Sequence, residues 1–224
     1  MMPEPAGSAI LVTMTERDKA SLEWFRWASR IRAIAQTGLA YAKDPYDLDR
    51  YTELNSIAME CLARVAAQTV PDVSDQFAGE TGYPTPKVDV RAVVFHESRV
   101  LLVRERLDGK WSLPGGWADV GHSPGEVAAK EVLEESGYVV RPRKVLAVFD
   151  KAKHGHPLSL HHAYKLFILC DLEGGAPATS VETDAVGFFG KGEIPPLSPG
   201  RVTAIQLARM FEHLERPDLP TDFD

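Results

Sequence analysis

Residues 115–138 read GGWADVGHSPGEVAAKEVLEESGY, and this stretch is the most informative part of the chain. A glycine-rich loop precedes a helix-forming run that carries Glu131, Glu134 and Glu135. Residues three and four apart share one face of an α-helix, so we expect these carboxylates to converge. Like charges held together raise one another's pKa unless a cation neutralises them, and oxygen ligands select hard cations such as Mg²⁺. The pattern predicts a metal-dependent phosphate site.

Both ends of this helix are marked in the sequence. Ser123 to Glu126 forms a capping box with Pro124 at the first helical position, and Gly137 is expected to end the helix. The alternative is a solvated, glutamate-rich surface helix, which the glycine loop and the caps disfavour. The face opposite the glutamates is small and apolar and suits packing on a sheet: Ala128, Ala129, Val132 and Leu133.

The segment resembles the Nudix box, whose pattern is G-x5-E-x7-R-E-U-x-E-E-x-G-U, with U a bulky apolar residue. His122 departs from the first Glu of the pattern, and Lys130 departs from its Arg. The positions that match are Gly116, Glu131, Val132, Glu134, Glu135, Gly137 and Tyr138.

The resemblance extends to IAQTGLAYAKDPYD, YPTPKVDVRAVVF, GKWSLPGGWADVG and HHAYKLFILC, and covers the chain from about Leu22 to Asp224. These segments look like the Nudix subfamily that carries an N-terminal helical domain. Its members are described as ADP-ribose pyrophosphatases, and a CDP-choline pyrophosphatase is also placed there. The resemblance implies an α/β fold, a three-layer α/β/α sandwich with a mixed sheet, preceded by a small helical hairpin domain.

Composition limits the partners and the compartment. The chain has 224 residues and a formal net charge of −7 without a dense Lys/Arg run, which disfavours duplex nucleic acid. Cys61 and Cys170 lie in apolar sequence, and we expect buried free thiols and a reducing cytoplasm. Residues 8–14, SAILVTM, are too short for a membrane span and lack the flanks of a signal peptide.

The first third of the chain predicts two helices, Thr15–Thr37 and Asp47–Thr69, joined by a short turn. Two amphipathic helices alone bury little surface, so the stripe that includes Trp24, Trp27 and Ile31 is expected to pack in a core or a homodimer interface. Residues 70–86 are rich in Gly, Pro and acids and predict a linker. We therefore expect residues 1–80 to form an N-terminal helical domain with its linker, for dimerisation or as a substrate cap, and residues 81–224 to form the hydrolase domain.

The period of the apolar pattern changes after the linker. β-Branched runs that alternate with turn residues predict strands, and a helix on each side of them suggests a mixed sheet between helices. The predicted strands are Lys87–Phe95, Arg99–Glu105, Lys110–Leu113, Tyr138–Lys151, Leu160–Leu172 and Val186–Phe189, with a last helix over Arg201–Leu214.

Several residues are candidates for the chemistry. Glu131 and Glu135, one turn apart, are the expected direct ligands of Mg²⁺, or alternatively Mn²⁺, and Glu134 is a ligand or a water-mediated one. The resemblance adds the backbone carbonyl of Gly115 as a ligand. Glu182, in a loop ahead of a strand, is a candidate acid for catalysis, with a solvated loop carboxylate as the alternative.

Substrate contacts are less sharply marked. Arg104 and Arg106, after the second strand, are candidate phosphate clamps, with a surface pair as the alternative. Trp117 is a candidate for stacking on a base, with a loop anchor as the alternative. His154 and His162 belong to a histidine cluster that is a candidate for phosphate binding or pocket shaping. The spacing of this cluster fits no familiar zinc site.

These features predict a Mg²⁺-dependent pyrophosphohydrolase that cleaves a nucleoside diphosphate linked to another moiety, ADP-ribose-like or a CDP-alcohol, into a nucleoside monophosphate and a phosphorylated product. The alternative is a catalytically weak, Nudix-fold nucleotide sensor, which His122 makes conceivable. In the resembling family the Glu at that position can pair with the Arg eight residues later. Here either another acid, such as Glu126 or Asp119, pairs with Lys130, or the loop is looser.

Overall fold

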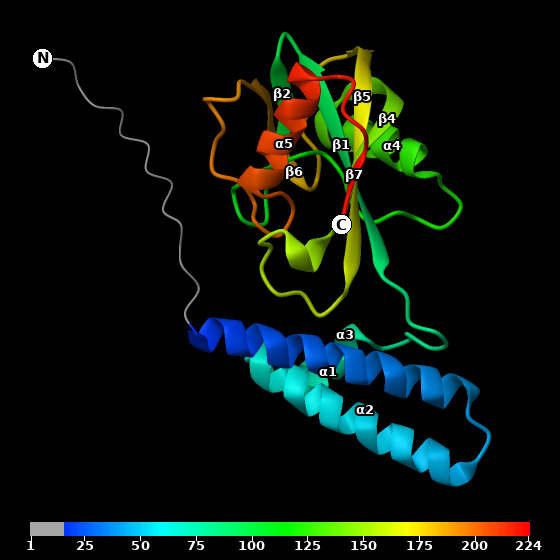
Figure 1. Ribbon diagram of the computed structural model, residues 1–224. Helices are drawn as coiled ribbons and strands as arrows, with labels where there is room; N and C mark the ends of the chain where they lie inside the picture. Colours follow the sequence, from blue (N-terminus) through cyan, green and yellow to red (C-terminus); the bar gives the residue numbers. More distant parts are fainter. Residues whose placement is uncertain (1–15) are drawn as a thin grey trace, which may run out of the picture. The chain divides into compact units, whose positions relative to one another are not determined.

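The computed structural model describes residues 16–224, and the chain divides into two compact units (Figure 1). The first, the helical unit, ends at Pro84, and the second, the sheet unit, begins at Thr85. The apolar run at residues 8–14 and the predicted helix start at Thr15 lie outside the described residues. Among the described helices, none combines the length and apolar character that crossing a bilayer requires.

The helical unit consists of α1 (Glu16–Tyr41), α2 (Pro45–Ala66) and α3 (Val70–Gln76). The turn between α1 and α2 is as short as expected, because Asp44 caps α2 by accepting hydrogen bonds from two backbone N–H groups of its first turn. The prediction that residues 70–86 form only a linker was wrong. Thr69 and Asp72 form a reciprocal capping box, and a proline is tolerated in the first helical turn.

Two adjacent faces of α1 are apolar. One face is buried within the unit, where Phe25, Ala28 and Ala35 pack and the Arg32 guanidinium lies 3.5 Å from the ring centroid of Phe77. Arg32 also pairs with Glu80 at 3.2 Å, which ties the segment after α3 to α1. The second face includes Trp24, Trp27 and Ile31, which are 55%, 47% and 38% exposed. The stripe predicted from sequence is thus a surface of this chain and not part of its own core.

The sheet unit contains a mixed sheet that has seven strands within the described residues, in the order β3-β2-β1-β5-β4-β7, with β6 paired to β2. β1 runs parallel to β5, whereas β1–β2, β2–β6 and β4–β5 are antiparallel. The strands are β1 (Lys87–His96), β2 (Arg99–Glu105), β3 (Trp111–Ser112), β4 (Tyr138–Asp150), β5 (Ala163–Gly175), β6 (Thr183–Phe189) and β7 (Asp222–Phe223).

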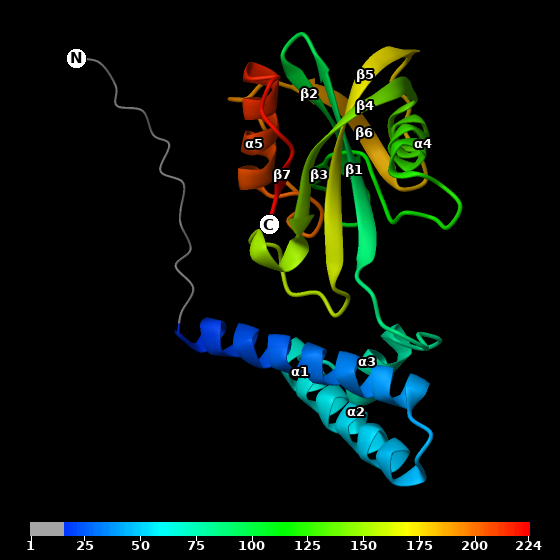
Figure 2. The same ribbon diagram turned by 45° about the vertical axis from the view of Figure 1, so that its right-hand side comes forward.

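Helix α4 (Pro124–Ser136) and helix α5 (Ala204–Glu215) lie on opposite sides of the sheet (Figure 2). Val127, Ala128 and Val132 of α4 join one apolar core, and Leu207 and Met210 of α5 join the other. The predicted α/β/α sandwich is therefore confirmed. One detail was wrong, because Leu133 is 53% exposed and does not pack on the sheet.

The two cysteines only partly follow the prediction. Both are free thiols, and Cys170 is buried in the core on the α4 side of the sheet, but Cys61 is only half-buried. The α2 face buries Ala58, Met59, Leu62 and Ala63 instead.

β1 and β2 are paired near their connecting turn and separate beyond it. The loop after β3 takes the place of β2 beside β1. Ala92 N–H donates to Pro114 O at 2.8 Å, and Val90 N–H donates to Gly116 O at 2.9 Å. The glycine-rich loop is therefore fixed to the central strand of the sheet.

Candidate active site

Gly115 is the point at which the loop approaches the sheet most closely. Its φ is +148°, and a Cβ added to it would lie 2.0 Å from the carbonyl oxygen of Val90. Only glycine can occupy this position without moving β1. The lack of a side chain therefore fixes the path of the loop.

Helix α4 begins and ends as the sequence predicts. Ser123 accepts from the N–H of Glu126, and the Glu126 carboxylate accepts from the N–H of Ser123, which completes the capping box. Gly137 adopts φ 76° and ends the helix. These caps determine the register of the glutamates relative to the loop.

Glu135 is buried beneath the loop, with 5% of its surface exposed. Its Oε2 accepts a hydrogen bond from Gly115 N–H at 3.0 Å. Burial raises the pKa of Glu135 to about 8, although the Arg91 guanidinium and the Gly115 N–H both oppose the shift. Ionisation of this carboxyl is therefore costly unless a cation lies near it.

Glu131 lies one turn earlier on the same face. A Cβ on Gly116 would lie 3.0 Å from Glu131 Oε1, so the second glycine leaves room for this carboxylate. Burial raises the pKa of Glu131 as well, and the carboxylate of Glu134 adds to the shift. Both glycines of the loop thus lie against the two inward carboxylates.

Glu134 is less enclosed than Glu131 and Glu135. Its side chain is 57% exposed and lies 3.9 Å from the ammonium of Lys130. Among the residues that the structure describes, no three His, Cys, Asp or Glu side chains are close enough together to enclose a metal ion. The prediction that all three carboxylates converge is therefore not met, because Glu134 is directed toward solvent and Lys130.

The donor set nevertheless fits a hard divalent cation. Glu131 and Glu135 offer carboxylate oxygens from one helix face, and a cation between them would offset the cost of ionising buried Glu135. Backbone oxygen from the Gly115 loop is of the same ligand class. The residues present are consistent with magnesium or manganese chemistry.

Glu182 lies at the rim of this site. It is exposed, its carbonyl accepts from Arg106 N–H at 2.8 Å, and its charge contributes to raising the pKa of Glu131. The next residue, Thr183, donates its hydroxyl to the carbonyl of Glu135 at 2.7 Å. The loop that carries Glu182 is therefore tied to the end of α4.

The other sequence candidates make contacts of their own. Arg104 Nε donates to Asp184 at 2.6 Å, and Arg106 Nε donates to the Ser180 carbonyl at 3.1 Å. Trp117 lies in the loop beside β1 and is 49% exposed.

The two histidines lie at the β4–β5 connection. His154 stacks on Phe149 with ring centroids 4.0 Å apart and contacts Asp224, whereas His162 contacts Asp150 at 3.0 Å. Each therefore has a carboxylate neighbour outside the glutamate helix.

The loop is braced to the helix by a substitute ion pair. Lys130 Nζ lies 3.0 Å from Asp119 Oδ2, while Glu126 is engaged in the capping box with Ser123. Of the two outcomes expected from His122 and Lys130, the structure therefore shows the pairing with another acid, and Asp119 supplies it.

Sequence reasoning missed a buried network beside Glu135. Arg91 is 5% exposed, pairs with Asp89 at 2.7 Å, and donates to the Leu113 carbonyl at 3.2 Å. Lys165 is fully buried and pairs with Asp89 at 2.6 Å. The sequence carries one sign of this network, because charged residues stand within the otherwise apolar strand segments VDVRAVV and YKLFIL.

Comparison with known proteins identifies both units. Residues 85–209 match the family described as "NUDIX domain", and residues 22–77 match "UDP-X-like, N-terminal oligomerisation domain". The chain is 48% identical to the "Putative ADP-ribose pyrophosphatase YjhB" of Bacillus subtilis, over 92% of this chain and 99% of that protein.

Two solved structures are also similar. An ADP-ribose pyrophosphatase from Streptococcus suis shares 46% identity with a TM-score of 0.58, covering 62% of this chain and all (100%) of that one. A UDP-X diphosphatase shares 30% identity with a TM-score of 0.59, covering 91% of this chain and 99% of that one.

The raised pKa of Glu135 predicts a pH-dependent stability of the metal-free protein. The native state keeps this proton up to about pH 8, whereas the unfolded chain releases it near 4.5. The native state binds more protons between these values, so the free energy of unfolding falls as pH rises, by at most about 1.4 kcal/mol per pH unit. Glu135→Gln should flatten this dependence in urea titrations with a chelator present. The same slope in Glu135→Gln as in the natural sequence would show that another group is responsible, and Glu173→Gln on the surface is the control.

The Asp119–Lys130 pair predicts that His122 is not a defect. Because the brace already exists, His122→Glu should change kcat/KM for Mg²⁺-dependent hydrolysis by less than about tenfold, or 1.4 kcal/mol in activation free energy. Steady-state kinetics of the variant provide the test. A rise of several hundredfold would mean that the natural site is crippled and would favour the sensor alternative.

Proposed function

The chain belongs to the Nudix hydrolase family, and on that premise we propose that it is a divalent-metal-dependent pyrophosphohydrolase of nucleoside diphosphate derivatives. The reaction takes the form NDP–X + H₂O → NMP + phospho-X. The observation that carries the proposal is the buried Glu135, held against the Gly115 N–H beside Glu131. A carboxyl that is costly to ionise in the free protein and lies under a glycine loop is suited to binding a cation together with phosphate oxygens.

We assign Glu131 and Glu135 as the residues that hold the ion, with the Gly115 carbonyl as a further oxygen donor and Glu134 as a ligand that acts through a water molecule. Magnesium, or manganese in its place, would neutralise phosphate oxygens and lower the pKa of the attacking water. Glu182 is the proposed general base, because it is exposed at the rim and within electrostatic reach of Glu131. It would take the proton of the water on a carboxylate oxygen.

The substrate proposal rests on the relatives. Their names point to ADP-ribose and to UDP-linked compounds, so ADP-ribose is the first candidate and a UDP- or CDP-linked compound is the second. Arg104, Arg106, Trp117, His154 and His162 remain candidates for substrate contacts.

A panel of nucleotides incubated with the protein and Mg²⁺, followed by separation of the products, tests the proposal. Release of a nucleoside monophosphate and a phosphorylated second product is expected. Tight binding without any cleavage would favour a nucleotide sensor instead.

Removal of a ligand charge should abolish most of the activity. Glu131→Gln and Glu135→Gln keep the side-chain volume but remove the carboxylate charge. We therefore expect turnover to fall by about 10²-fold or more. The exposed Glu173→Gln should not change it. Thermal unfolding would check that each variant is folded. Near-normal Mg²⁺-dependent turnover in both variants would exclude the metal assignment.

We also propose that the protein is a homodimer that associates through the helical unit, with residues 1–80 as the assembly domain and 81–224 as the hydrolase domain. The family match to an N-terminal oligomerisation domain supports an oligomer. The exposed face of α1 supplies a seam, because its residues are three, four or seven apart, as in a coiled coil. The α1 seam consists of Trp24, Trp27, Ile31, Ile34 and Tyr41.

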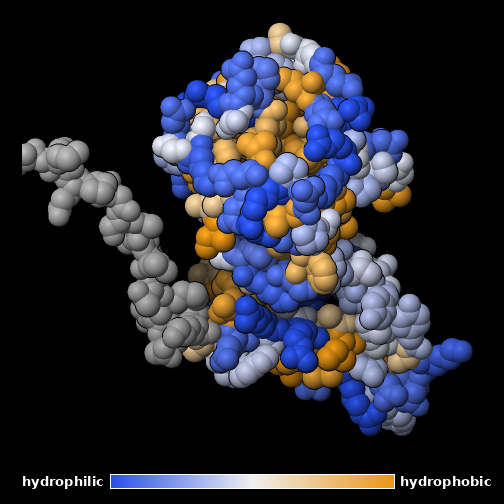
Figure 3. All heavy atoms as spheres, turned by 45° about the horizontal axis from the view of Figure 1, so that its top comes forward, coloured by the Kyte–Doolittle hydropathy of each residue, from blue (hydrophilic) through white to orange (hydrophobic). Residues whose placement is uncertain are grey.

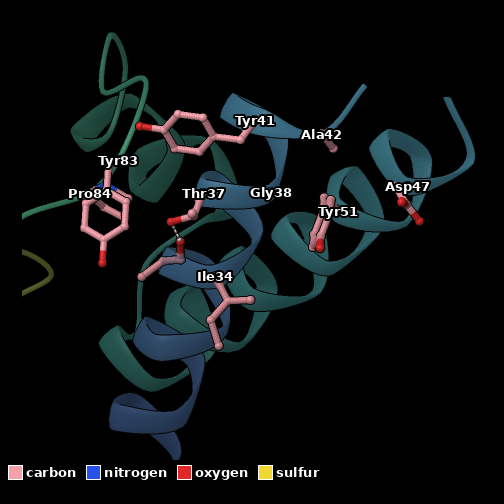
Figure 4. Close-up of a pocket in the computed structure, with 10 residues that line it drawn as sticks. Ile34, Thr37, Gly38, Tyr41, Ala42, Asp47, Tyr51, Tyr83 and Pro84 are labelled. Atoms are coloured by element: carbon pink, nitrogen blue, oxygen red, sulfur yellow. Dashed lines mark hydrogen bonds between the residues drawn. The ribbon is translucent and has the colours of Figure 1, made fainter. Parts of the chain in front are cut away.

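The C-terminal half of the α1 seam borders an open groove of about 630 Å³ (Figure 4). Ile34, Gly38 and Tyr41 line it from α1, and the ring of Tyr51 lies opposite Gly38. A Cβ on Gly38 would lie 2.4 Å from that ring, so the small residue permits close packing of α1 and α2. Figure 3 shows hydrophobic side chains reaching the surface among hydrophilic ones.

The two free cysteines are compatible with a reducing compartment, and we propose a cytoplasmic location.

Obligate helical interfaces of the kind proposed bury about 2,000 Å² or more. The α1 seam is the surface on which such an interface would form.

The double variant Trp27→Glu/Ile31→Glu should dissociate the dimer, because it places four like charges at the centre of a two-fold interface. Light scattering at micromolar concentration should give a dimer mass for the natural sequence and a monomer mass for the variant. The control is Arg50→Glu on the exposed surface of α2. A monomer mass for the natural sequence would refute the assembly proposal.

A further inference from the structure

The last carbonyl groups of α4 accept hydrogen bonds from the segment that follows β5. Such carbonyls have no partner within their own helix. Ser136 O and Gly137 O accept from backbone N–H groups of this segment, at 2.9 and 3.3 Å. Glu135 O accepts from a side chain instead, because the hydroxyl of Thr183 lies 2.7 Å away. The segment is therefore bound to the end of the helix that carries the proposed metal ligands.

The Thr183 hydroxyl belongs to a continuous chain of hydrogen bonds. A carbonyl oxygen only accepts, so Thr183 gives its proton to Glu135 O. The Thr183 oxygen also lies 3.1 Å from Ser180 Oγ, which is therefore the donor of that bond. Ser180 Oγ in turn accepts from Glu182 N–H at 3.1 Å. Hydrogen bonds through two hydroxyls thus join the backbone of Glu182 to the backbone of Glu135.

The middle of this chain is protected from water. Thr183 is fully buried, and Ser180 is half-buried. Ser180 Oγ accepts a second bond, from Thr183 N–H at 3.1 Å, which closes a local turn around Glu182. Because water has little access to replace these bonds, removal of a hydroxyl would leave a buried polar group without a partner.

The backbone of Glu182 is held on its other side as well. Its carbonyl accepts from Arg106 N–H at 2.8 Å, and Ser180 N–H donates to the Thr183 carbonyl at 3.0 Å. The Glu182 carboxylate, by contrast, has neither a hydrogen bond nor an ion pair among the residues that the structure describes. A general base must come within about 3 Å of the water that it deprotonates. A free carboxylate on a fixed backbone meets this requirement.

Glu135 is the other end of the chain, and it is held twice. Its carboxylate accepts from Gly115 N–H, and its carbonyl accepts from the Thr183 hydroxyl. The same residue therefore fixes one proposed metal ligand under the glycine loop and the loop of Glu182 on the helix. Any shift of the last turn of α4 would move both together.

We propose that the hydroxyls of Thr183 and Ser180 hold the loop of Glu182 on α4 and so position Glu182 as the base beside the ligand Glu135. Thr183 is thus a positioning residue, which acts on turnover through Glu182. The inference rests on the proposed function for the role of Glu182, but the hydroxyl link itself is testable without hydrolysis.

The chain offers a matched set of variants. Thr183→Val removes the hydroxyl and nearly keeps the shape, whereas Thr183→Ser keeps the hydroxyl. Ser180→Ala breaks the link without uncovering the Glu135 carbonyl, so it provides the test if Thr183→Val does not fold. Thr221→Val is the control, because Thr221 donates its hydroxyl to Val145 O at 2.8 Å, a bond of the same kind outside the link. Circular dichroism and thermal unfolding check the fold of each variant.

Steady-state kinetics at saturating Mg²⁺ test the positioning role, with the nucleoside diphosphate derivative that the panel identifies. We expect Thr183→Val and Ser180→Ala to lower kcat about tenfold or more, and to change KM less than about threefold. Thr183→Ser should restore most of kcat, and Thr221→Val should change neither constant. A normal kcat in Thr183→Val and Ser180→Ala, an equal loss in Thr221→Val, or a change confined to KM would overturn the proposal.

A double-variant cycle identifies the route of the effect. Glu182→Gln removes the base and should lower kcat by about 10²-fold or more. If Thr183 acts through Glu182, adding Thr183→Val to Glu182→Gln should lower kcat by less than about twofold further. Two losses that multiply in full would show that Thr183 acts by another route, and the positioning role would be rejected.

Failure of the proposed function gives a different result. Amide hydrogen exchange of Glu182 and Thr183, followed by NMR without substrate, reports the link independently of turnover. If Glu182→Gln turns over normally, the assignment of the base is wrong, but faster exchange in Thr183→Val and not in Thr183→Ser would still establish the link. If Glu182→Gln is slow while Thr183→Val has normal exchange and kcat, the hydrolase proposal remains and this inference fails.

Discussion

The hydrogen bond from Gly115 N–H to Glu135 Oε2 is the contact on which the site depends. It joins three elements: β1, which leaves no room for a Cβ at Gly115, the loop itself, and helix α4. A side chain at Gly115 would displace the loop from β1 and so withdraw the N–H from the carboxylate. The burial of Glu135 and the raised pKa that burial causes follow from that close approach.

Local signals in the sequence predicted most of the fold. The capping box at Ser123, the stop at Gly137 and the strand Arg99–Glu105 appear as expected, because each depends on neighbours within a few residues. The alternation of apolar residues likewise predicted the order of strands and helices. The short β7 was missed, since its backbone pairs with β4, which is far away in the chain, and Asp222 is held by the side chains of Arg209 and His213. Helix α3 was missed because Pro71 reads as a terminator and here occupies the first turn.

The candidate site was predictable to the extent that it lies on one helix. Helical spacing alone brings Glu131 and Glu135 together, whereas Glu134 is exposed and lies near Lys130 instead. The ion pairs in the buried network of Asp89, Arg91 and Lys165 were not predictable. Lys165 lies on β5 and the other two residues on β1, and only the parallel pairing of these strands brings them together. Charged residues within apolar strands signalled that something was buried there, but did not specify a partner.

The pairing of Asp119 with Lys130 has a consequence for how such sequences are recognised. A search that demands the customary letters at positions 122 and 130 would score two mismatches. Yet an ion pair still links the loop to the helix, with its acidic residue at position 119 and not at position 122. A consensus pattern of this kind records one solution to a geometric requirement. Tolerance of substitution is therefore better judged by asking which atoms can still meet than by counting identical letters.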